Sequence, residues 1–383
     1  MKYLKYIFRN ALRNKLRSIL TIFSIGSSLM LTTLLYGFMD SQDEVREKIR
    51  QYDRIVVLSQ QGFMQPLPIA HVDDVRSING VRAAVPFQWY GGLYEDERVP
   101  FAQFGSDAEY YFDVWSELKI EPARLEAWKD DITGCVVGDT LAQERGWQVG
   151  DKIRLKGTIY RFDLDLTLQG IYQEAENPGP LVFHLKYLDE GLRQMGDRMS
   201  GNAGIVYVKA ESSDVIPTLT ERIDANFENS TKPTRTESED AFVQIFMDMI
   251  GNIQGYIQNI SLAVIFSLVL VAANAMAMSV RERTSEVATL KAIGFTRNGI
   301  LTLILTESVF ISVLGGIFGV LAGVGIWWAG GVAFPGQWPN ADIPSQTLSI
   351  GIGLSAAIGL FAGIIPSWRA AHFSVIDGLR RVV

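Results

Sequence analysis

The residues of this chain best suited to chemistry lie in a charged stretch between two long apolar segments, at positions 280–299. Val287, Leu290 and Ile293 recur there at helical spacing, and Gly294 stands where a left-handed helix stop belongs. Such a helix can dock a soluble partner, because apolar side chains supply contact area and charged side chains fix orientation through ion pairs. The alternative is a solvated loop. The predicted docking helix comprises Arg281, Glu282, Arg283, Glu286, Val287, Leu290, Lys291, Ala292, Ile293 and Gly294.

Residue types that support catalysis or metal binding form no recognisable constellation elsewhere. His71, His184 and His372 lie far apart in the sequence, and no Cys/His cluster has the spacing of a metal site. The one cysteine, Cys135, lies in an apolar run and is predicted to be a buried hydrophobe. The chain contains no Gly-Lys dipeptide, so it has no P-loop to hold a nucleotide. We therefore expect no catalytic residue, no bound metal or cofactor, and no nucleic-acid partner.

The apolar segments on both sides of the docking helix are long enough to cross a membrane. Hydrophobic residues make up 48% of the chain, and about 20 mostly apolar residues in a row span the hydrocarbon of a bilayer. The third segment exceeds this length, so we expect it to tilt, to protrude or to be interrupted near Gly323, Gly330 and Gly331. The four predicted transmembrane helices are residues 18–38, 257–280, 300–332 and 348–367.

The distribution of charge predicts how these helices are oriented. The net charge is −7, but residues 41–258 hold 22 basic and 36 acidic side chains, whereas the rest of the chain holds 13 and 6. The first seventeen residues contain no acidic side chain, which by the positive-inside rule places the N-terminus in the cytosol. Four spans then place residues 39–256 and the loop 333–347 outside. Residues 281–299 and the tail 368–383 lie inside, together with a predicted amphipathic helix at 1–17.

Residues 39–256 are predicted to form a large α+β extracytoplasmic domain inserted between the first and second transmembrane helices. With one cysteine it cannot rely on internal disulfides, so a packed core must hold it. Helical patterns at 40–52 and from Glu237 to Val280 predict stalks that continue directly from the first span and into the second. The remaining pattern alternates short helices, at 72–78 and 139–146, with strands at 54–59, 81–89, 134–137, 152–156, 160–168 and 205–208.

Two polar or small-residue patterns lie inside the predicted spans. Gly315, Gly319 and Gly323 recur every four residues, which lets helices approach closely in lipid. This helix-packing stripe fits dimerisation and packing within the chain equally well. Asn274 and Glu307 are polar residues within or near the spans, where such groups need a partner or water. Glu307 lies near the cytosolic end of its span, which favours a role at the interface.

Three sequence motifs in membrane order resemble the MacB/FtsX-like permease family, which includes LolC and LolE. The docking stretch is similar to the family's coupling-helix pattern in Arg281 to Arg283, Glu286 and Leu290 to Gly294. The segment 11–18 before the first span and the segment 363–371 at the end of the fourth also match. Val136 to Gly138 and Val149 to Ile153 resemble the family's periplasmic core domain. Val375 and Gly378 depart from the family's usual C-terminal tail.

The resemblance implies the membrane subunit of an ABC transporter in the inner membrane of a bacterium. ATP and Mg²⁺ would bind a separate ATP-binding subunit, and the helix at 281–294 would couple that subunit's motion to the extracytoplasmic domain. The implied task is export or extraction of a lipoprotein, peptide or other amphiphile. A second permease chain, alike or different, and a periplasmic adaptor are implied partners. The alternative is an FtsX-like transducer that regulates an extracytoplasmic protein such as a cell-wall hydrolase.

Overall fold

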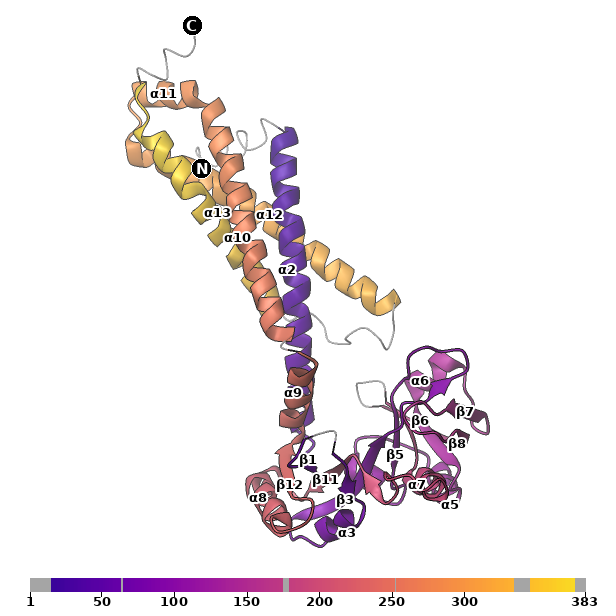
Figure 1. Ribbon diagram of the computed structural model, residues 1–383. Coiled ribbons are helices and arrows are strands. Elements are labelled where there is room, and N and C mark those ends of the chain that lie inside the picture. Colours follow the sequence, from indigo (N-terminus) through magenta and orange to yellow (C-terminus); the bar gives the residue numbers. More distant parts are fainter. Residues whose placement is uncertain (1–14, 63–64, 175–178, 252, 334–344, 376–383) are drawn as a thin grey trace. The chain divides into compact units, whose positions relative to one another are not determined.

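The chain forms two compact units in a computed structural model that describes residues 15–62, 65–174, 179–251, 253–333 and 345–375 (Figure 1). The helical unit comprises Met1–Asp43 with Ile250–Val383, and the α/β unit comprises Glu44–Met249. The predicted amphipathic segment 1–17, the loop 333–347 and the tail 368–383 fall largely outside the described residues.

The helical unit contains the four long apolar helices that the sequence predicts. Each is long and apolar enough to cross a membrane, over Ser18–Arg50, Gly255–Glu282, Arg297–Gly331 and Gln346–His372. The predicted fold class is confirmed, because the α/β unit is inserted between the first and second of them. The helices of this unit are α2 (Lys15–Arg50), α10 (Ile253–Glu282), α11 (Thr284–Ala292), α12 (Arg297–Ala333) and α13 (Ser345–His372).

Helix α12 runs for 37 residues without interruption at its glycines, so of the three expectations for the third apolar segment only tilting and protrusion remain. One prediction about helix continuity differs from the structure. The predicted continuous helix from Glu237 to Val280 is wrong. Strand β12 (Thr234–Ser238) covers its start, and Gly251 separates α9 (Glu239–Ile250) from α10. Gly251 has φ +136°, a backbone conformation that ends a right-handed helix and that glycine alone adopts without strain.

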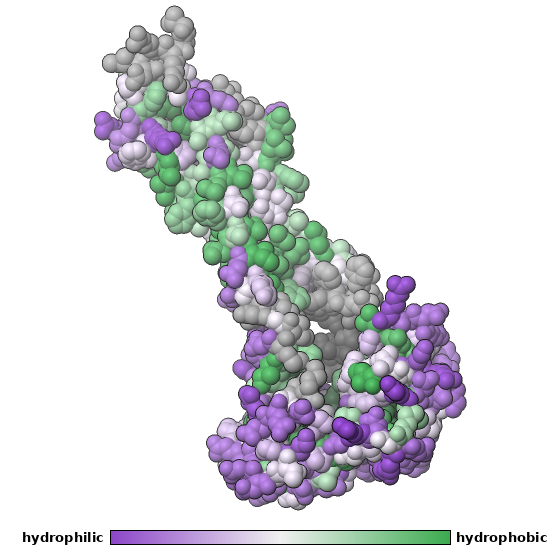
Figure 2. All heavy atoms as spheres, in the orientation of Figure 1, coloured by the Kyte–Doolittle hydropathy of each residue, from purple (hydrophilic) through white to green (hydrophobic). Residues whose placement is uncertain are grey.

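The surface of the helical unit suits contact with lipid. Figure 2 shows hydrophobic residues over much of the helices and mainly hydrophilic residues over the α/β unit. Large apolar side chains project from three of the long helices, and Leu262, Leu321 and Phe361 are each more than 60% exposed. A water-soluble domain rarely presents so continuous an apolar surface, so this pattern agrees with membrane-spanning helices.

The glycine stripe of α12 packs within the chain, against α2. A Cβ atom added at Gly319 would lie 2.4 Å from the backbone oxygen of Gly26, and one at Gly315 would lie 2.8 Å from Ile25. At Gly323 the nearest atoms belong to Thr33, at 3.1 Å. These residues therefore let α12 and α2 approach to backbone contact, which is the intrachain use of the pattern.

The α/β unit is built on a ten-stranded sheet with the order β12-β1-β11-β3-β5-β9-β6-β8-β7-β4. Pairs β5–β9 and β6–β8 are parallel and the other neighbours are antiparallel. Strands β2 (Leu67–Pro68) and β10 (Asn202–Ala203) form a separate pair. Besides β12, the strands of the large sheet are β1 (Arg54–Ser59), β3 (Val81–Trp89), β4 (Leu93–Tyr94), β5 (Gln103–Ser106), β6 (Gly134–Gly138), β7 (Lys152–Lys156), β8 (Leu164–Tyr172), β9 (Leu181–His184) and β11 (Ile205–Ala210).

Helices cover this sheet in two groups. Near one end, α3 and α8 pack on β1, β3 and β11 through Val75, Ile223 and Phe227, all buried (Figure 1). Near the other end, α6 and α7 pack on β6 to β9, where Cys135 is fully buried as predicted. The helices of this unit are α3 (Ala70–Arg76), α4 (Tyr111–Val114), α5 (Pro122–Asp130), α6 (Asp139–Arg145), α7 (Leu185–Gln194) and α8 (Ile216–Phe227), with a short 3₁₀ turn at Ser213–Val215.

Most predicted strands occur where expected, and one is displaced. Strands β1, β3 and β7 have the predicted bounds. Strand β8 begins at Leu164 instead of Tyr160, because residues 157–163 form a loop that Asp163 closes by accepting a hydrogen bond from the Gly157 amide at 3.0 Å. Tyr160 is buried within that loop, where its hydroxyl bonds Gln88 at 2.6 Å. Tyr160 fits the alternating apolar pattern that predicted the strand because it is buried in this loop, although it lies outside β8.

A buried charge cluster lies where β1 meets the start of α9. The Arg54 side chain is 4% exposed, donates to Glu239 at 2.6 Å and also bonds Glu117. Burial raises the pKa of Glu239, while the Arg54 charge opposes that shift. One oxygen of Glu117 is buried without a hydrogen bond. The cluster joins three separate chain segments, and its two carboxylates share a single arginine.

Candidate functional site

Helix α11 is a separate short helix whose two ends are defined by local geometry. It begins after Arg283, whose backbone (φ −108°, ψ 19°) leaves the helical region and ends α10. It ends at Gly294, with φ +105°. The Gly294 amide donates to the Lys291 carbonyl and the Phe295 amide donates to the Leu290 carbonyl, both at 3.0 Å. This pair of bonds is the Schellman motif, so the predicted left-handed helix stop is confirmed.

The next helix starts immediately after this turn. The Thr296 hydroxyl accepts a hydrogen bond from the Gly299 amide at 3.1 Å, which caps the first turn of α12. Phe295, just before the cap, packs in one cluster with Ile300, four residues into the helix. A hydrophobic contact of this kind fixes the angle at which the chain enters a helix.

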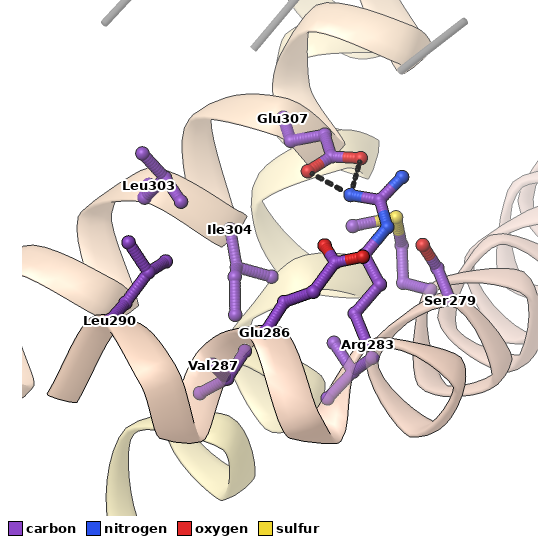
Figure 3. Close-up of a pocket in the computed structure, with 10 residues that line it drawn as sticks. Ser279, Arg283, Glu286, Val287, Leu290, Leu303, Ile304 and Glu307 are labelled. Atoms are coloured by element: carbon purple, nitrogen blue, oxygen red, sulfur yellow. Dashed lines mark hydrogen bonds and ion pairs between the residues drawn. The ribbon is translucent and has the colours of Figure 1, made fainter. Parts of the chain in front are cut away.

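An ion pair attaches the start of α11 to α12 (Figure 3). The Arg283 guanidinium donates from one nitrogen to both carboxylate oxygens of Glu307, at 2.8 and 3.0 Å. The two side chains are 18% and 5% exposed, respectively. Removing one member of such a pair leaves the other charge poorly solvated, so the pair holds α11 in a defined orientation. The polar group inside the apolar segment thus has its partner within the same chain.

A lysine attaches the end of α11 to α13. The Lys291 ammonium donates to the carbonyl oxygens of Ala371 and Phe373, at 2.7 and 2.6 Å. These carbonyls belong to the C-terminal end of α13, where the helix dipole favours a positive charge. Burial lowers the pKa of Lys291, and the nearby Arg297 charge lowers it further. Helix α11 is therefore tied to two different transmembrane helices.

The structure divides the predicted docking residues between two faces of α11. Val287 is 7% exposed and packs with Met276, Ile304 and Ala370, while Leu290 is half-buried. With Arg283 and Lys291, these residues hold the helix in place within the chain. Leu290, Arg283 and Lys291 thus have contacts within the chain that helical spacing does not reveal, and their predicted contact with a partner stays a prediction.

The opposite side of α11 and its two ends remain accessible. Ile293 is 73% exposed, an unusual position for a large apolar side chain next to a helix end. Ala292 and Gly294 beside it are exposed as well, and so are Arg281 and Glu282 before the helix. Glu286 is half-buried beside Arg283 in Figure 3. The exposed residues are the part of the predicted site that a partner can reach.

Two cavities lie beside α11. One is small, with about 30 Å³ of free space, and is lined by Arg283, Glu286, Leu290 and Glu307 among others (Figure 3). The other is larger, about 170 Å³, and lies between α10, α11 and α13. Across the residues that the structure describes, no group of three or more histidine, cysteine, aspartate or glutamate side chains is placed to hold a metal ion.

Two family models match this chain, and together they cover most of it. The model described as "MacB-like periplasmic core domain" matches residues 18–226, and the one described as "FtsX-like permease C-terminal" matches residues 260–375. The first alone covers more than half of the chain. The chain therefore belongs to the MacB/FtsX-like permeases of ABC transporters, a family of multi-pass membrane proteins with an extracytoplasmic domain. Membership implies an ATP-binding partner subunit.

Similar proteins occur in bacteria and archaea. An uncharacterized ABC transporter permease of Methanocaldococcus jannaschii is 23% identical, over 98% of this chain and 96% of its own length. The uncharacterized ABC transporter permease YknZ of Bacillus subtilis is 25% identical, over 99% of each chain. The macrolide export ATP-binding/permease protein MacB of Neisseria meningitidis is 27% identical, over 96% of this chain and 59% of that protein.

Solved structures of two extracytoplasmic domains show similarity to this chain. The periplasmic region of MacB from Actinobacillus actinomycetemcomitans aligns with 51% of this chain and 94% of that structure, at 15% identity and a TM-score of 0.38. The extracellular domain of YknZ, from Gram-positive bacteria, aligns with 48% of this chain and 99% of that structure, at 13% identity and a TM-score of 0.35.

Proposed function

We propose that this chain couples ATP hydrolysis in a separate ATP-binding subunit to movement of its own extracytoplasmic domain. That movement drives export or extraction of a lipoprotein, peptide or other amphiphile. The observation that carries the proposal is the contrast between the fixed side of α11 and its exposed C-terminal end. Arg283 and Lys291 fix the helix to α12 and α13, and Ile293 is exposed at its end. A helix held in this way can receive a push at its exposed face and pass it to two transmembrane helices.

The charge distribution supports an orientation with α11 in the cytosol, where an ATP-binding subunit operates. The short segments on that side carry Arg281, Arg283, Lys291, Arg297 and Arg369, in agreement with the positive-inside rule. In this orientation both termini lie in the cytosol and the acidic α/β unit lies outside. The membrane that the helices cross is the inner membrane of a bacterium. ATP and Mg²⁺ bind the partner subunit.

The docking role of α11 is tested by co-purification of the ATP-binding subunit with the full chain. Ile293→Asp places a charge where a partner's apolar pocket would be, and we expect at least about a tenfold loss of complex, as for the central residue of an interface. Ile159→Asp is the matched control, since Ile159 is 61% exposed in the α/β unit. An intact complex with stimulated ATPase activity in the Ile293 variant would contradict the docking role.

A polar residue on the lipid-facing side of α10 supports a second permease chain as partner. Asn274 is exposed, with Leu270 and Met278 exposed one turn before and after it. Within the described residues its amide has no hydrogen-bond partner, and an amide in hydrocarbon gains about 1–2 kcal/mol by bonding across helices. Cysteine placed at 274 should cross-link two chains in membranes, whereas cysteine at 262, an exposed position about three turns away on the same helix, should not. Equal cross-linking at both positions would argue against an ordered dimer.

Transport is favoured over the regulation of a cell-wall hydrolase by the names of the MacB relatives, which refer to macrolide export. The two roles differ in what the α/β unit binds. Purified chain that carries lipid, lipoprotein or peptide supports transport, and purified chain that carries an extracytoplasmic enzyme supports the regulatory role.

A further inference from the structure

The larger cavity beside α11 has a composition that differs from an ordinary packing defect. Its free space of about 170 Å³ is roughly ten times the 10–15 Å³ that one water molecule needs. Three helices contribute to it, from the end of α10, the start of α11 and the last turns of α13. The lining residues are Ala277, Val280, Arg281, Thr284, Val287, Pro366, Arg369, Ala370 and Phe373.

Two arginines provide the polar part of this lining. Arg281 lies in the last turn of α10 and Arg369 in the last turn of α13, and both are exposed. Within the residues that the structure describes, neither guanidinium has a hydrogen bond or an ion pair. Two arginines at one opening repel each other unless an anion lies between them, and a guanidinium matches the geometry of a phosphate through paired hydrogen bonds.

Apart from Thr284, whose hydroxyl donates to the Arg281 carbonyl, the rest of the lining is apolar, and most of it belongs to membrane-spanning helices. Ala277 and Val280 lie in the span Gly255–Glu282, and Pro366 and Ala370 lie in the span Gln346–His372. Beside the cavity, Trp368 is 55% exposed and its ring lies 4.7 Å from that of His372. Exposed tryptophan is typical of the level of lipid headgroups. The cavity therefore combines a cationic opening at headgroup level with an apolar floor toward the hydrocarbon.

We propose that this cavity binds the headgroup of an anionic phospholipid from the leaflet on the α11 side. The phosphate lies between Arg281 and Arg369, and the start of an acyl chain covers Ala277 and Val280. An acidic segment of a soluble protein would satisfy the arginines and leave the apolar floor uncovered, so the combination favours a lipid. The proposal rests on the membrane placement of the four helices and is independent of the ATP-binding partner. A lipid bound there contacts α11 at Thr284 and Val287.

The experiment measures lipid binding to the delipidated full chain by native mass spectrometry. Phosphatidylglycerol and phosphatidylcholine with identical acyl chains are compared, and we expect at least about tenfold tighter binding of the anionic lipid, at about fivefold for each arginine. Arg281→Gln and Arg369→Gln should each weaken phosphatidylglycerol binding about fivefold. Arg297→Gln removes one exposed arginine outside the cavity and should change binding less than twofold. Ala277→Leu fills the floor while keeping both arginines, and should weaken binding severalfold.

Each contrary outcome overturns the proposal in a distinguishable way. Equal affinity for the two lipids, or unchanged binding in both arginine variants, removes the charge argument. Unchanged binding in Ala277→Leu contradicts the place assigned to the acyl chain. Full displacement of the lipid by millimolar glycerol phosphate assigns the site to a soluble phosphate compound. If the arginine variants lose the ATP-binding subunit and keep phosphatidylglycerol, the arginines serve protein docking instead. Failure of the Ile293 test leaves the lipid-binding results unaffected, because they require the permease chain alone.

Discussion

Each unit of this protein pairs an arginine with glutamate beside the end of a helix, with different numbers of carboxylates. Beside α11, Arg283 donates to one glutamate, Glu307, in a balanced pair of one positive and one negative charge. In the α/β unit, Arg54 pairs with both Glu117 and Glu239, an unbalanced cluster of one positive and two negative charges. In the unbalanced cluster, burial raises the pKa of Glu239, and the negative charge of Glu117 acts in the same direction.

The largest effect is expected when the shared arginine is removed. Arg54→Met leaves two buried carboxylates without a counter-charge, and breaking a buried pair costs about 3–5 kcal/mol. We expect a marked drop in the thermal unfolding midpoint of the purified full chain, followed by tryptophan fluorescence. Arg50→Met is the control, because Arg50 is 70% exposed beside Asp240 and exposed ion pairs contribute little to stability. Equal losses in the two variants would remove the distinction between buried and exposed pairs.

The balanced pair should respond to double substitution in a way that the unbalanced cluster cannot. Glu307→Leu removes the buried carboxylate to which Arg283 donates, at a cost on the order of 2 kcal/mol because the Arg283 side chain keeps some exposure to water. Arg283→Met combined with Glu307→Leu should recover most of this loss, since an apolar pair can replace a buried ion pair. The measurement is a double-mutant cycle on unfolding free energies. Additive losses would show that the two side chains act independently.

A smaller effect is expected at the other attachment of α11. Lys291→Met removes two hydrogen bonds to the carbonyls of Ala371 and Phe373, and we expect a loss of about 1–2 kcal/mol. Lys186→Met, at an exposed lysine of the α/β unit, should change stability by less than about 0.5 kcal/mol. If the Lys291 variant is as stable as this control, α11 is held by the Glu307 contact and apolar packing alone.

The smallest effect is expected at Glu239, and it depends on pH. A carboxyl whose pKa is raised on folding stabilises the fold most below its unfolded pKa of about 4.5, and that contribution is lost as pH rises through the folded pKa. Glu239→Gln carries no charge, so we expect its unfolding free energy to stay within about 1 kcal/mol of wild type at pH 7. The difference should shift in favour of wild type as pH falls toward 4.5. A difference independent of pH would mean that Glu239 does not titrate in this range.

Much of this architecture follows from the sequence because its signals are local. Four apolar segments and the segregation of charge predict four spans and an inserted α+β domain, and Gly294 predicts the end of α11. The break at Gly251 was missed because one glycine inside a helical pattern is usually tolerated. The inward direction of Arg283 and Lys291 was also missed. Their partners Glu307 and Ala371 lie 24 and 80 residues further along the chain, and only the packing of α12 and α13 brings them together.

The turn between α11 and α12 limits how these two helices can move. Residues Ile293 to Thr296 form the whole connection. Ile293 caps α11, Gly294 adopts the left-handed conformation, Phe295 packs with Ile300, and the Thr296 hydroxyl caps α12. A connection with no spare residue cannot stretch or swivel to absorb a displacement. Under the proposed coupling role of α11, force applied at Ile293 would pass through this short connection to the first turn of α12. Inserting two glycines after Gly294 would lengthen it while leaving the exposed surface of α11 unchanged.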